Sequence, residues 1–209
     1  MQGADCRRFG HRNTIDLRRR MRKSVAIYGG SFDPPHVSHV LAAVSALKLG
    51  GFERVLVVPV FEHAFHKQLT AFEHRTRMCE LAFSGIADVE VSPLERNLST
   101  PSLTLRTLEH LAVLHPDWQM RLLVGSDVLG DTAKWHAFDR ISELAPPYVV
   151  ARPGYEHPNS QAALLPDVSS TRIREALKAP AAPEHAALLA ASVPREVLEY
   201  IAAHRLYAG

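Results

Sequence analysis

Residues 24–39 read SVAIYGGSFDPPHVSH, and this stretch decides the class of fold that we expect. It begins with a short β-prone run that stops at Gly29 and Gly30. From residue 36 to residue 49, apolar residues then recur at steps of three and four, the spacing of a helix with one buried face. A strand, a glycine turn and a helix in this order form the first unit of an α/β fold.

The same alternation continues along the rest of the chain. Apolar strands alternating with amphipathic helices indicate a parallel sheet covered on both faces. We therefore expect an α/β, Rossmann-like parallel sheet with helices on both faces, in a single domain over residues 24–209 that has a C-terminal helical extension. Further strands are predicted at residues 55–58, 89–91, 121–124 and 148–151, helices at 73–83, 103–114, 138–144, 171–178 and 196–204, a loop at 152–166 and a spacer at 179–183.

Residues 1–23 form a basic leader before the first predicted strand. We expect it to be a disordered tail, or a stretch upstream of a natural start at Met21, because no apolar secretory core follows its charges. An RNA-binding arm and a targeting peptide are the alternatives. Its cationic residues are Arg7, Arg8, Arg12, Arg18, Arg19, Arg20, Arg22 and Lys23.

The composition of the whole chain is that of an ordinary globular protein. With 46% hydrophobic and 22% charged residues and a net charge of +2, it lacks the basic excess that broad nucleic-acid binding needs. No stretch approaches the roughly 18 apolar residues of a membrane span. Cys6 and Cys79 lie far apart and do not indicate a disulfide framework or a metal knuckle. We expect a cytoplasmic protein that binds neither nucleic acid nor membranes.

The loop after the first predicted strand offers several groups for binding phosphate. Gly29 and Gly30 let the backbone approach a ligand without a Cβ in the way. His36 and His39 share one face of the first helical turn, beside free N–H groups and the positive end of the helix dipole. The pattern is neither G-x-G-x-x-G nor a P-loop, and a metal bound by the two histidines lacks an evident third ligand. A polyphosphate is the favoured ligand, with a metal or a purely structural turn as alternatives.

Two motifs resemble those of the nucleotidylyltransferase superfamily. Residues 30–39, GSFDPPHVSH, resemble its first signature, and residues 168–174, VSSTRIR, resemble its late phosphate loop. The resemblance implies catalytic roles for His36, His39 and Arg174, with the histidines on the α- and β-phosphates of ATP. The late loop would hold the β- and γ-phosphates, bridged by Mg²⁺ as cofactor, and no separate metal site of the protein is expected. The ATP-binding residues implied are Gly29, Gly30, Ser31, Phe32, Gly125, Asp127, Ser170 and Thr171.

A third element, Gly125-Ser126-Asp127 followed by Trp135, resembles the G-x-D…W of the bacterial nicotinate mononucleotide adenylyltransferase family. In that family the Asp lies beside the nucleotide ribose and the Trp stacks on the pyridine ring, which implies the same for Asp127 and Trp135. The chemistry is consistent, since a carboxylate accepts from ribose hydroxyls and an indole offers a flat face to an electron-poor ring. Further substrate-binding residues implied by this resemblance are Lys67, Thr104 and Arg152.

The implied reaction moves AMP from ATP onto nicotinate mononucleotide, giving nicotinate adenine dinucleotide and pyrophosphate. ATP and a pyridine mononucleotide are then the partners, and a homo-oligomer is one option for the assembly. The alternatives are another acceptor, either nicotinamide mononucleotide or phosphopantetheine, and a nucleotide-binding sensor without turnover. The choice between nicotinate and nicotinamide depends on backbone N–H groups near Thr104 and Trp135.

Four features depart from the family pattern. Ser38 replaces the usual glycine between the signature histidines, where its side chain is expected to crowd the phosphate or to donate to it. Residues 60–67 lack the usual Pro-rich approach to a His-Lys pair, Leu103 stands where an aromatic residue is usual, and Arg106 stands where an acidic residue is common. The last three border the expected pyridine nucleotide, so they bear on the identity of the acceptor.

Overall fold

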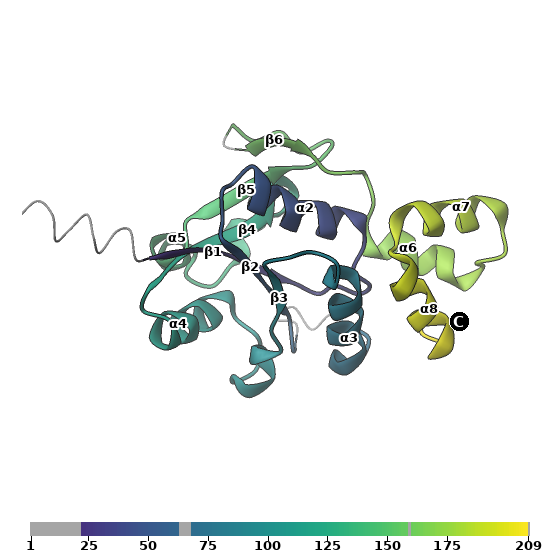
Figure 1. Cartoon of the computed structure of the whole chain (residues 1–209), viewed down its shortest axis with the longest axis horizontal. Helices are drawn as coiled ribbons and strands as arrows, with labels where there is room; N and C mark the ends of the chain where they lie inside the picture. The colour runs from purple at the N-terminus through teal and green to yellow at the C-terminus, as the bar shows by residue number, and fades with distance from the viewer. Residues whose placement is uncertain (1–21, 63–67, 159, 209) are drawn as a thin grey trace, which may run out of the picture.

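The computed structural model describes residues 22–62, 68–158 and 160–208 and contains one sheet of six parallel strands (Figure 1). The strand order is β3-β2-β1-β4-β5-β6. The strands β2 and β3 are therefore added on one side of β1, and β4, β5 and β6 are added on the other side, so that the direction reverses at β4. In such sheets ligands bind beyond the carboxyl ends of the strands, at the point of reversal. The strands are β1 Lys23–Gly30, β2 Arg54–Pro59, β3 Val89–Val91, β4 Trp118–Gly125, β5 Pro147–Ala151 and β6 Ser160–Leu164.

The central strand β1 is buried on both faces, as its apolar sequence requires. Ala26 packs into the hydrophobic cluster on one side of the sheet, while Val25 and Ile27 pack into the cluster on the other side. This alternation follows from the two-residue repeat of a strand. None of the three side chains is more than 2% exposed.

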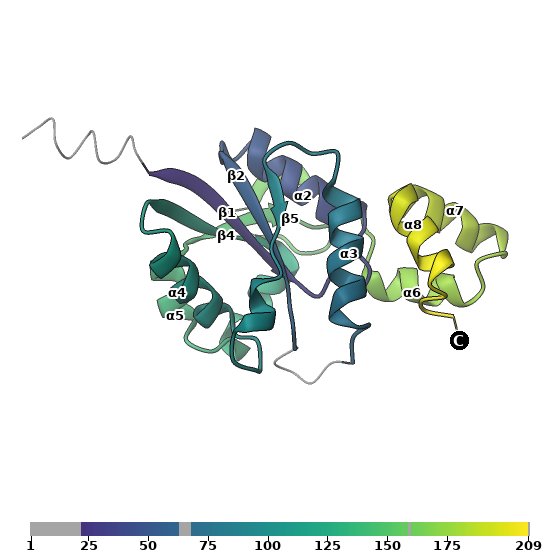
Figure 2. The same cartoon turned by 60° about the horizontal axis from the view of Figure 1, so that its bottom comes forward.

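Helices cover both faces of the sheet, as predicted (Figure 2). The cluster that contains Ala26 is completed by α2 and α3, and the opposite cluster by α4 and α5. Two short 3-10 helices, η1 and η2, follow β3 and β4. These elements are α2 Val37–Lys48, α3 Phe72–Phe83, η1 Leu94–Asn97, α4 Thr104–Leu114, η2 Ser126–Lys134 and α5 Phe138–Leu144.

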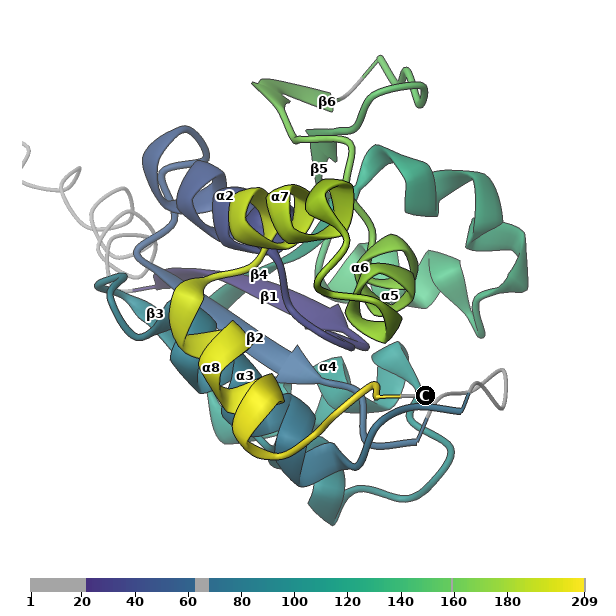
Figure 3. The ribbon, with the colours of Figure 1, turned by 90° about the vertical axis from the view of Figure 1, so that its right-hand side faces the viewer.

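The C-terminal extension consists of α6 Ser170–Lys178, α7 Pro183–Ser192 and α8 Arg195–Ala203. Figure 3 shows α7 lying over α2 and α8 lying over α3, and the contacts between these pairs agree. Val197 and Ile201 of α8 are buried in the same cluster as the helices beneath. The extension therefore shares its core with the sheet.

The predictions for two segments without secondary structure were wrong. The expected loop at 152–166 contains β6, a parallel edge strand that pairs with β5. The expected spacer at 179–183 leads directly into α7, which the prediction omitted; Pro183 is its first residue, where the missing N–H costs nothing. Lys23, assigned to the leader, belongs to β1, and residues 1–21 lie outside the described part of the chain. Among the described residues, none of the helices combines the length and the apolar character of a membrane span.

Candidate active site

The two signature histidines lie together where α2 begins, beyond the carboxyl end of β1. His36 is the N-cap residue, and its backbone N–H donates to Nδ1 of His39 at 3.1 Å. The centroids of the two imidazole rings are 3.8 Å apart. The spacing of three residues thus brings the rings into contact, as the sequence predicted.

Both histidines are held in the neutral form. Burial in the first place, and the charge of Arg152 in the second, lower the pKa of His36 to about 3. Burial, then His36 and Arg152, hold the pKa of His39 well below its usual value. The Nδ1 atom of His36 is buried, and within the described residues it has no hydrogen-bond partner. It is therefore a polar atom that a bound ligand could satisfy.

Phe32 supports the histidines from behind. Its backbone has a φ of +48° and its side chain is 1% exposed, so the ring lies in the core and not in the open site. The ring meets His39 edge-on, with 4.9 Å between centroids. A Cβ at Gly30 would lie 3.1 Å from the Phe32 ring, whereas one at Gly29 would meet nothing within 4 Å. Phe32, predicted to bind ATP, can therefore do so only through its backbone.

The late phosphate loop is bonded to the first motif. Ser170 donates through Oγ to the carbonyl of Pro34 at 2.9 Å, and Arg174 donates through Nη1 to the carbonyl of Asp33 at 2.6 Å. Arg174 also donates through Nη2 to Oγ1 of Thr171 at 3.3 Å. The structure thus brings together two motifs that lie more than 130 residues apart in the sequence.

Ser38 does not face the phosphate site. Its side chain is 2% exposed and donates through Oγ to the carbonyl of Pro166 at 2.9 Å. The expectation that it would crowd a phosphate or donate to one was wrong, because a helix residue two positions after His36 points to a different side. It joins α2 to the segment before the late phosphate loop.

The Asp33 carboxylate is buried beneath this loop and holds two distant segments. It is 2% exposed, and it accepts from the Tyr207 hydroxyl at 2.7 Å and from the Thr70 N–H at 3.3 Å. Burial first, and the Asp33 carboxylate as well, raise the pKa of Tyr207, so this hydroxyl stays protonated and donates. The phosphate loop is therefore held partly from the C-terminal segment.

A pocket of about 670 Å³ opens beside Gly29 and Gly30 at the reversal point of the sheet. Trp135 lines it, and this ring packs edge-on against Phe138 with 6.0 Å between centroids. The pocket gathers residues from β1, β2, β4, η1, α4 and the segments after them. Of the predicted site residues, its lining includes Gly29, Gly30, Ser31, Thr104, Asp127 and Trp135.

Asp127 is fixed at the edge of this pocket by Arg152. Nη1 of Arg152 donates to Oδ2 of Asp127 at 3.1 Å, and Nη2 donates to the carbonyl of Val168 at 2.7 Å. A Cβ at Gly125 would lie 2.3 Å from Oδ1 of Asp127 and 3.1 Å from Cδ of Arg152. Gly125 thus leaves the space that this ion pair occupies. The guanidinium of Arg152, predicted to bind substrate, is engaged with protein groups.

The opposite wall of the pocket is held by Glu95, which the sequence did not single out. Glu95 is 6% exposed; it accepts from the Thr107 hydroxyl at 2.8 Å and from the Phe61 N–H at 3.1 Å. A second link joins the same loops, because Ser102 donates through its N–H to the carbonyl of Glu62 at 2.9 Å. No sequence signal marks Glu95, since its partners come from two other segments.

Two departures noted in the sequence lie at this wall. Leu103 lines the pocket directly. Arg106 does not line it; its guanidinium donates to the carbonyls of Ser99 and of Pro101, the latter at 3.0 Å. Arg106 therefore shapes the loop that carries the pocket residues Pro101 and Ser102.

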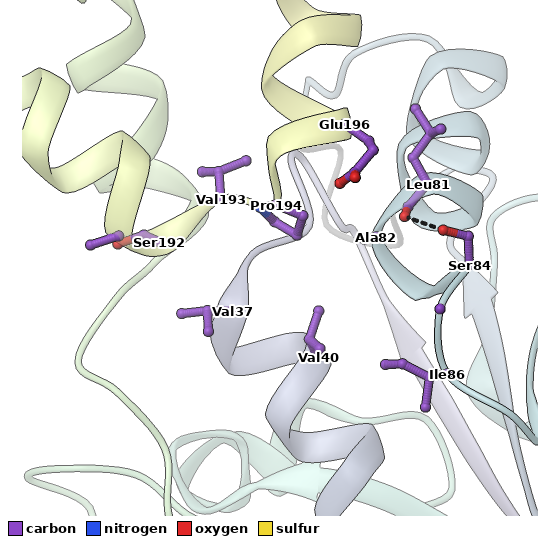
Figure 4. Close-up of a pocket in the computed structure, with 12 residues that line it drawn as sticks. Val37, Val40, Leu81, Ala82, Ser84, Ile86, Ser192, Val193, Pro194 and Glu196 are labelled. Carbon is purple, nitrogen blue, oxygen red and sulfur yellow. Dashed lines mark hydrogen bonds between the residues drawn. The ribbon is translucent and has the colours of Figure 1, made fainter.

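A second pocket, of about 410 Å³, lies behind α2 (Figure 4). It is lined by Val37 and Val40 of α2, by residues at the end of α3, and by Pro194 and Glu196 where α8 begins. Glu196 is the one charged residue among its described lining residues, and no predicted site residue lines it. The first pocket is thus the candidate active site.

Lys67, another predicted substrate contact, lies outside the described residues. Among the described residues, no group of three or more His, Cys, Asp or Glu side chains could hold a metal ion.

The comparisons with known proteins address the family directly. The cytidylyltransferase-like family model matches residues 27–176. A probable nicotinate-nucleotide adenylyltransferase of Anaeromyxobacter dehalogenans (strain 2CP-C) is 45% identical over 190 residues, which cover 90% of this chain and 98% of the relative. The chain belongs to the nicotinate-nucleotide adenylyltransferase family. The predicted resemblance is thereby confirmed.

A second relative agrees with this assignment, and one solved structure shows the same fold. A probable nicotinate-nucleotide adenylyltransferase of Myxococcus xanthus is 36% identical over 184 residues, covering 88% of this chain and 94% of the relative. The solved structure of the Plasmodium falciparum nicotinic acid mononucleotide adenylyltransferase complexed with NaAD has a TM-score of 0.76 at 21% identity. The match covers 89% of this chain and 98% of the Plasmodium falciparum chain, and it confirms the Rossmann-like fold.

Proposed function

We propose that this chain transfers AMP from ATP to nicotinate mononucleotide, with release of pyrophosphate and formation of nicotinate adenine dinucleotide. One observation carries the proposal: the neutral His36–His39 pair, bonded through its loop to Ser170 and Arg174, lies next to a pocket lined by Trp135. Donors for a triphosphate and a face for a pyridine ring thus occur at one edge of the sheet. Membership of the family supports the choice of acceptor.

The chemistry asks the protein for alignment and charge stabilisation. The attacking phosphate of the acceptor is already an anion, so no general base is needed. Its oxygen forms a bond to the α-phosphorus of ATP while the bond from that phosphorus to pyrophosphate breaks, and the AMP moiety is thereby transferred. Because Nδ1 of His39 accepts from the His36 N–H, the neutral ring of His39 carries its proton on Nε2. We assign this N–H, and the His36 ring, to the oxygens of the α- and β-phosphates.

Ser170, Thr171 and Arg174 would hold the β- and γ-phosphates at the start of α6, where free N–H groups and the helix dipole favour anions. Mg²⁺ bound to the same phosphates would neutralise part of the charge on the departing pyrophosphate. In the free protein, Ser170 and Arg174 donate to the carbonyls of Pro34 and Asp33, so both side chains already lie beside the first motif.

Asp127 and Trp135 would bind the nucleosides. Asp127 has one buried oxygen, Oδ1, without a described partner, which suits a ribose hydroxyl. The N-terminus of α4 has no side-chain cap, so its N–H groups near Thr104 are available to a nicotinate carboxylate. A cytoplasmic location belongs to this proposal, since both substrates are highly charged nucleotides.

The test is steady-state kinetics with ATP and, in parallel, nicotinate mononucleotide, nicotinamide mononucleotide or phosphopantetheine. We expect pyrophosphate release, and a dinucleotide identified by mass spectrometry, with the highest kcat/KM for nicotinate mononucleotide. Turnover only with phosphopantetheine would overturn the proposal that nicotinate mononucleotide is the acceptor. ATP binding by calorimetry without pyrophosphate release from any acceptor would favour a nucleotide-binding sensor.

A further inference from the structure

The charge of the active-site pocket is unusual for a site that binds nucleotides. Among the described residues that line it, two are acidic, Glu95 and Asp127, and none is Lys or Arg. Asp127 has a counter-ion, because Arg152 donates to it at 3.1 Å. Glu95 has none among the described residues: both of its hydrogen bonds come from neutral donors, the Thr107 hydroxyl and the Phe61 N–H.

A buried carboxylate without a counter-ion is unfavourable unless something compensates its charge. Glu95 is 6% exposed, so water compensates little of it. Trp135 also lines the pocket, and the face of an indole attracts cations through its quadrupole. Both features favour a ligand that is flat and positively charged.

We propose that Glu95 is a specificity residue that recognises the positive charge of the pyridinium ring. This inference rests on the proposed function and deepens it. The ring nitrogen of a pyridine mononucleotide carries that charge because it is bonded to the ribose. The dihydropyridine form of the same mononucleotide has a neutral ring. Glu95 therefore selects the oxidised mononucleotide over the reduced one, while the nicotinate carboxylate, meta to the ring nitrogen, can lie toward α4.

Glu95→Gln is a suitable probe because the pocket can accommodate it. The amide oxygen of Gln can accept from the Phe61 N–H in place of Oε2 of Glu95. The amide nitrogen can donate to Oγ1 of Thr107, whose hydroxyl proton can then turn to the Leu103 carbonyl, 3.4 Å away. The substitution removes one negative charge and keeps both contacts.

The experiment measures dissociation constants by calorimetry for nicotinate mononucleotide and its dihydro form, with the purified full chain. We expect the wild type to bind the oxidised form about tenfold more tightly, and E95Q to reduce this ratio to about twofold or less. Glu62→Gln is the matched control, because Glu62 is exposed on the neighbouring loop and does not line the pocket; its ratio should equal that of the wild type. An unchanged ratio in E95Q would overturn the proposal.

A second variant separates charge from loop positioning. Thr107→Val removes the hydroxyl that donates to Glu95 but keeps the carboxylate, so its ratio should stay near that of the wild type. A loss of discrimination in T107V equal to that in E95Q would show that Glu95 acts only by holding the loops, and would overturn charge recognition. Because the readout is binding, failure of this inference is distinct from failure of AMP transfer, which the pyrophosphate assay reports.

Discussion

The backbone N–H of His36 donates to Nδ1 of His39, and this one bond determines which nitrogen of His39 carries the proton. With Nδ1 as an acceptor, Nε2 of the neutral ring is the donor. The low pKa of both rings keeps them neutral in the free protein. In the proposed function, His39 would therefore meet the phosphates as a fixed donor that needs no rearrangement when ATP binds.

Two substitutions of His39 separate these two nitrogens. The Asn oxygen in His39→Asn can replace Nδ1 as the acceptor from His36, but Asn has no group at the position of Nε2. Gln in His39→Gln places its amide nitrogen near Nε2. We expect kcat to fall about 10²–10³-fold in H39N, the usual cost of one lost oxyanion donor, and less in H39Q. Kinetics with thermal melts as a folding control test this; equal kcat values in the two variants would contradict the Nε2 assignment.

The depressed pKa of His36 predicts a loss of stability in acid. The unfolded chain binds this proton below about pH 6.5, whereas the folded chain binds it only near pH 3. The contribution is therefore complete above pH 6.5 and is lost as the pH falls toward 3. The slope is about 1.4 kcal/mol per pH unit for each such proton.

Denaturant unfolding between pH 6.5 and 5 measures this slope. His36→Gln should lower the slope by up to the contribution of one proton, about 1.4 kcal/mol per pH unit. His204→Gln serves as the control, because His204 lies exposed at the end of α8. An identical slope in H36Q and the wild type would show that His36 does not titrate in this way.

Gly125→Ala should displace the Asp127–Arg152 ion pair. The added Cβ would lie 2.3 Å from Oδ1 of Asp127, so the carboxylate must move. We expect the KM for ATP to rise about tenfold and the free energy of unfolding to fall by about 1–3 kcal/mol. Gly130→Ala, in the η2 helix that follows Gly125, is the control, since a Cβ at Gly130 meets nothing within 4 Å. Equal KM values for ATP in the two variants would show that the space left by Gly125 for the Asp127–Arg152 ion pair does not affect ATP binding.

Trp135→Ala should raise the KM for the acceptor and leave the KM for ATP unchanged. A stacked ring contributes about 1–3 kcal/mol, so the KM for nicotinate mononucleotide should rise tenfold or more. Trp135→Phe keeps a smaller aromatic face and should show a smaller increase. An unchanged acceptor KM in W135A would remove the stacking assignment.

The sequence predicted the elements with strong local patterns. The apolar runs of β1 and β4 and the three- and four-residue spacing in α2 are properties of neighbouring residues, and the structure confirms them. The strand β6 was missed because SQAAL is short and has no β-branched or aromatic residue, and only its pairing with β5 makes it a strand. The Ala-rich helix α7 was missed because Pro183 was assigned to the end of a spacer, although proline is favoured at the first helical position.

The same distinction applies to the site. The pairing of His36 with His39 could be predicted because both lie on one helical turn. The engagement of Arg152 with Asp127, 25 residues away, and the burial of Ser38 against Pro166, 128 residues away, depend on tertiary packing. The role of Glu95 was invisible for the same reason, since its donors belong to other segments.

The bond between Tyr207 and Asp33 has a consequence for how the molecule is made. These residues are 174 positions apart, and Arg174, which holds the same loop, is 141 positions from Asp33. During synthesis the first motif leaves the ribosome long before either partner exists, so the nascent loop lacks the contacts that fix it. Catalytic competence should therefore arise only once the segment around residue 207 has emerged from the ribosome and docked.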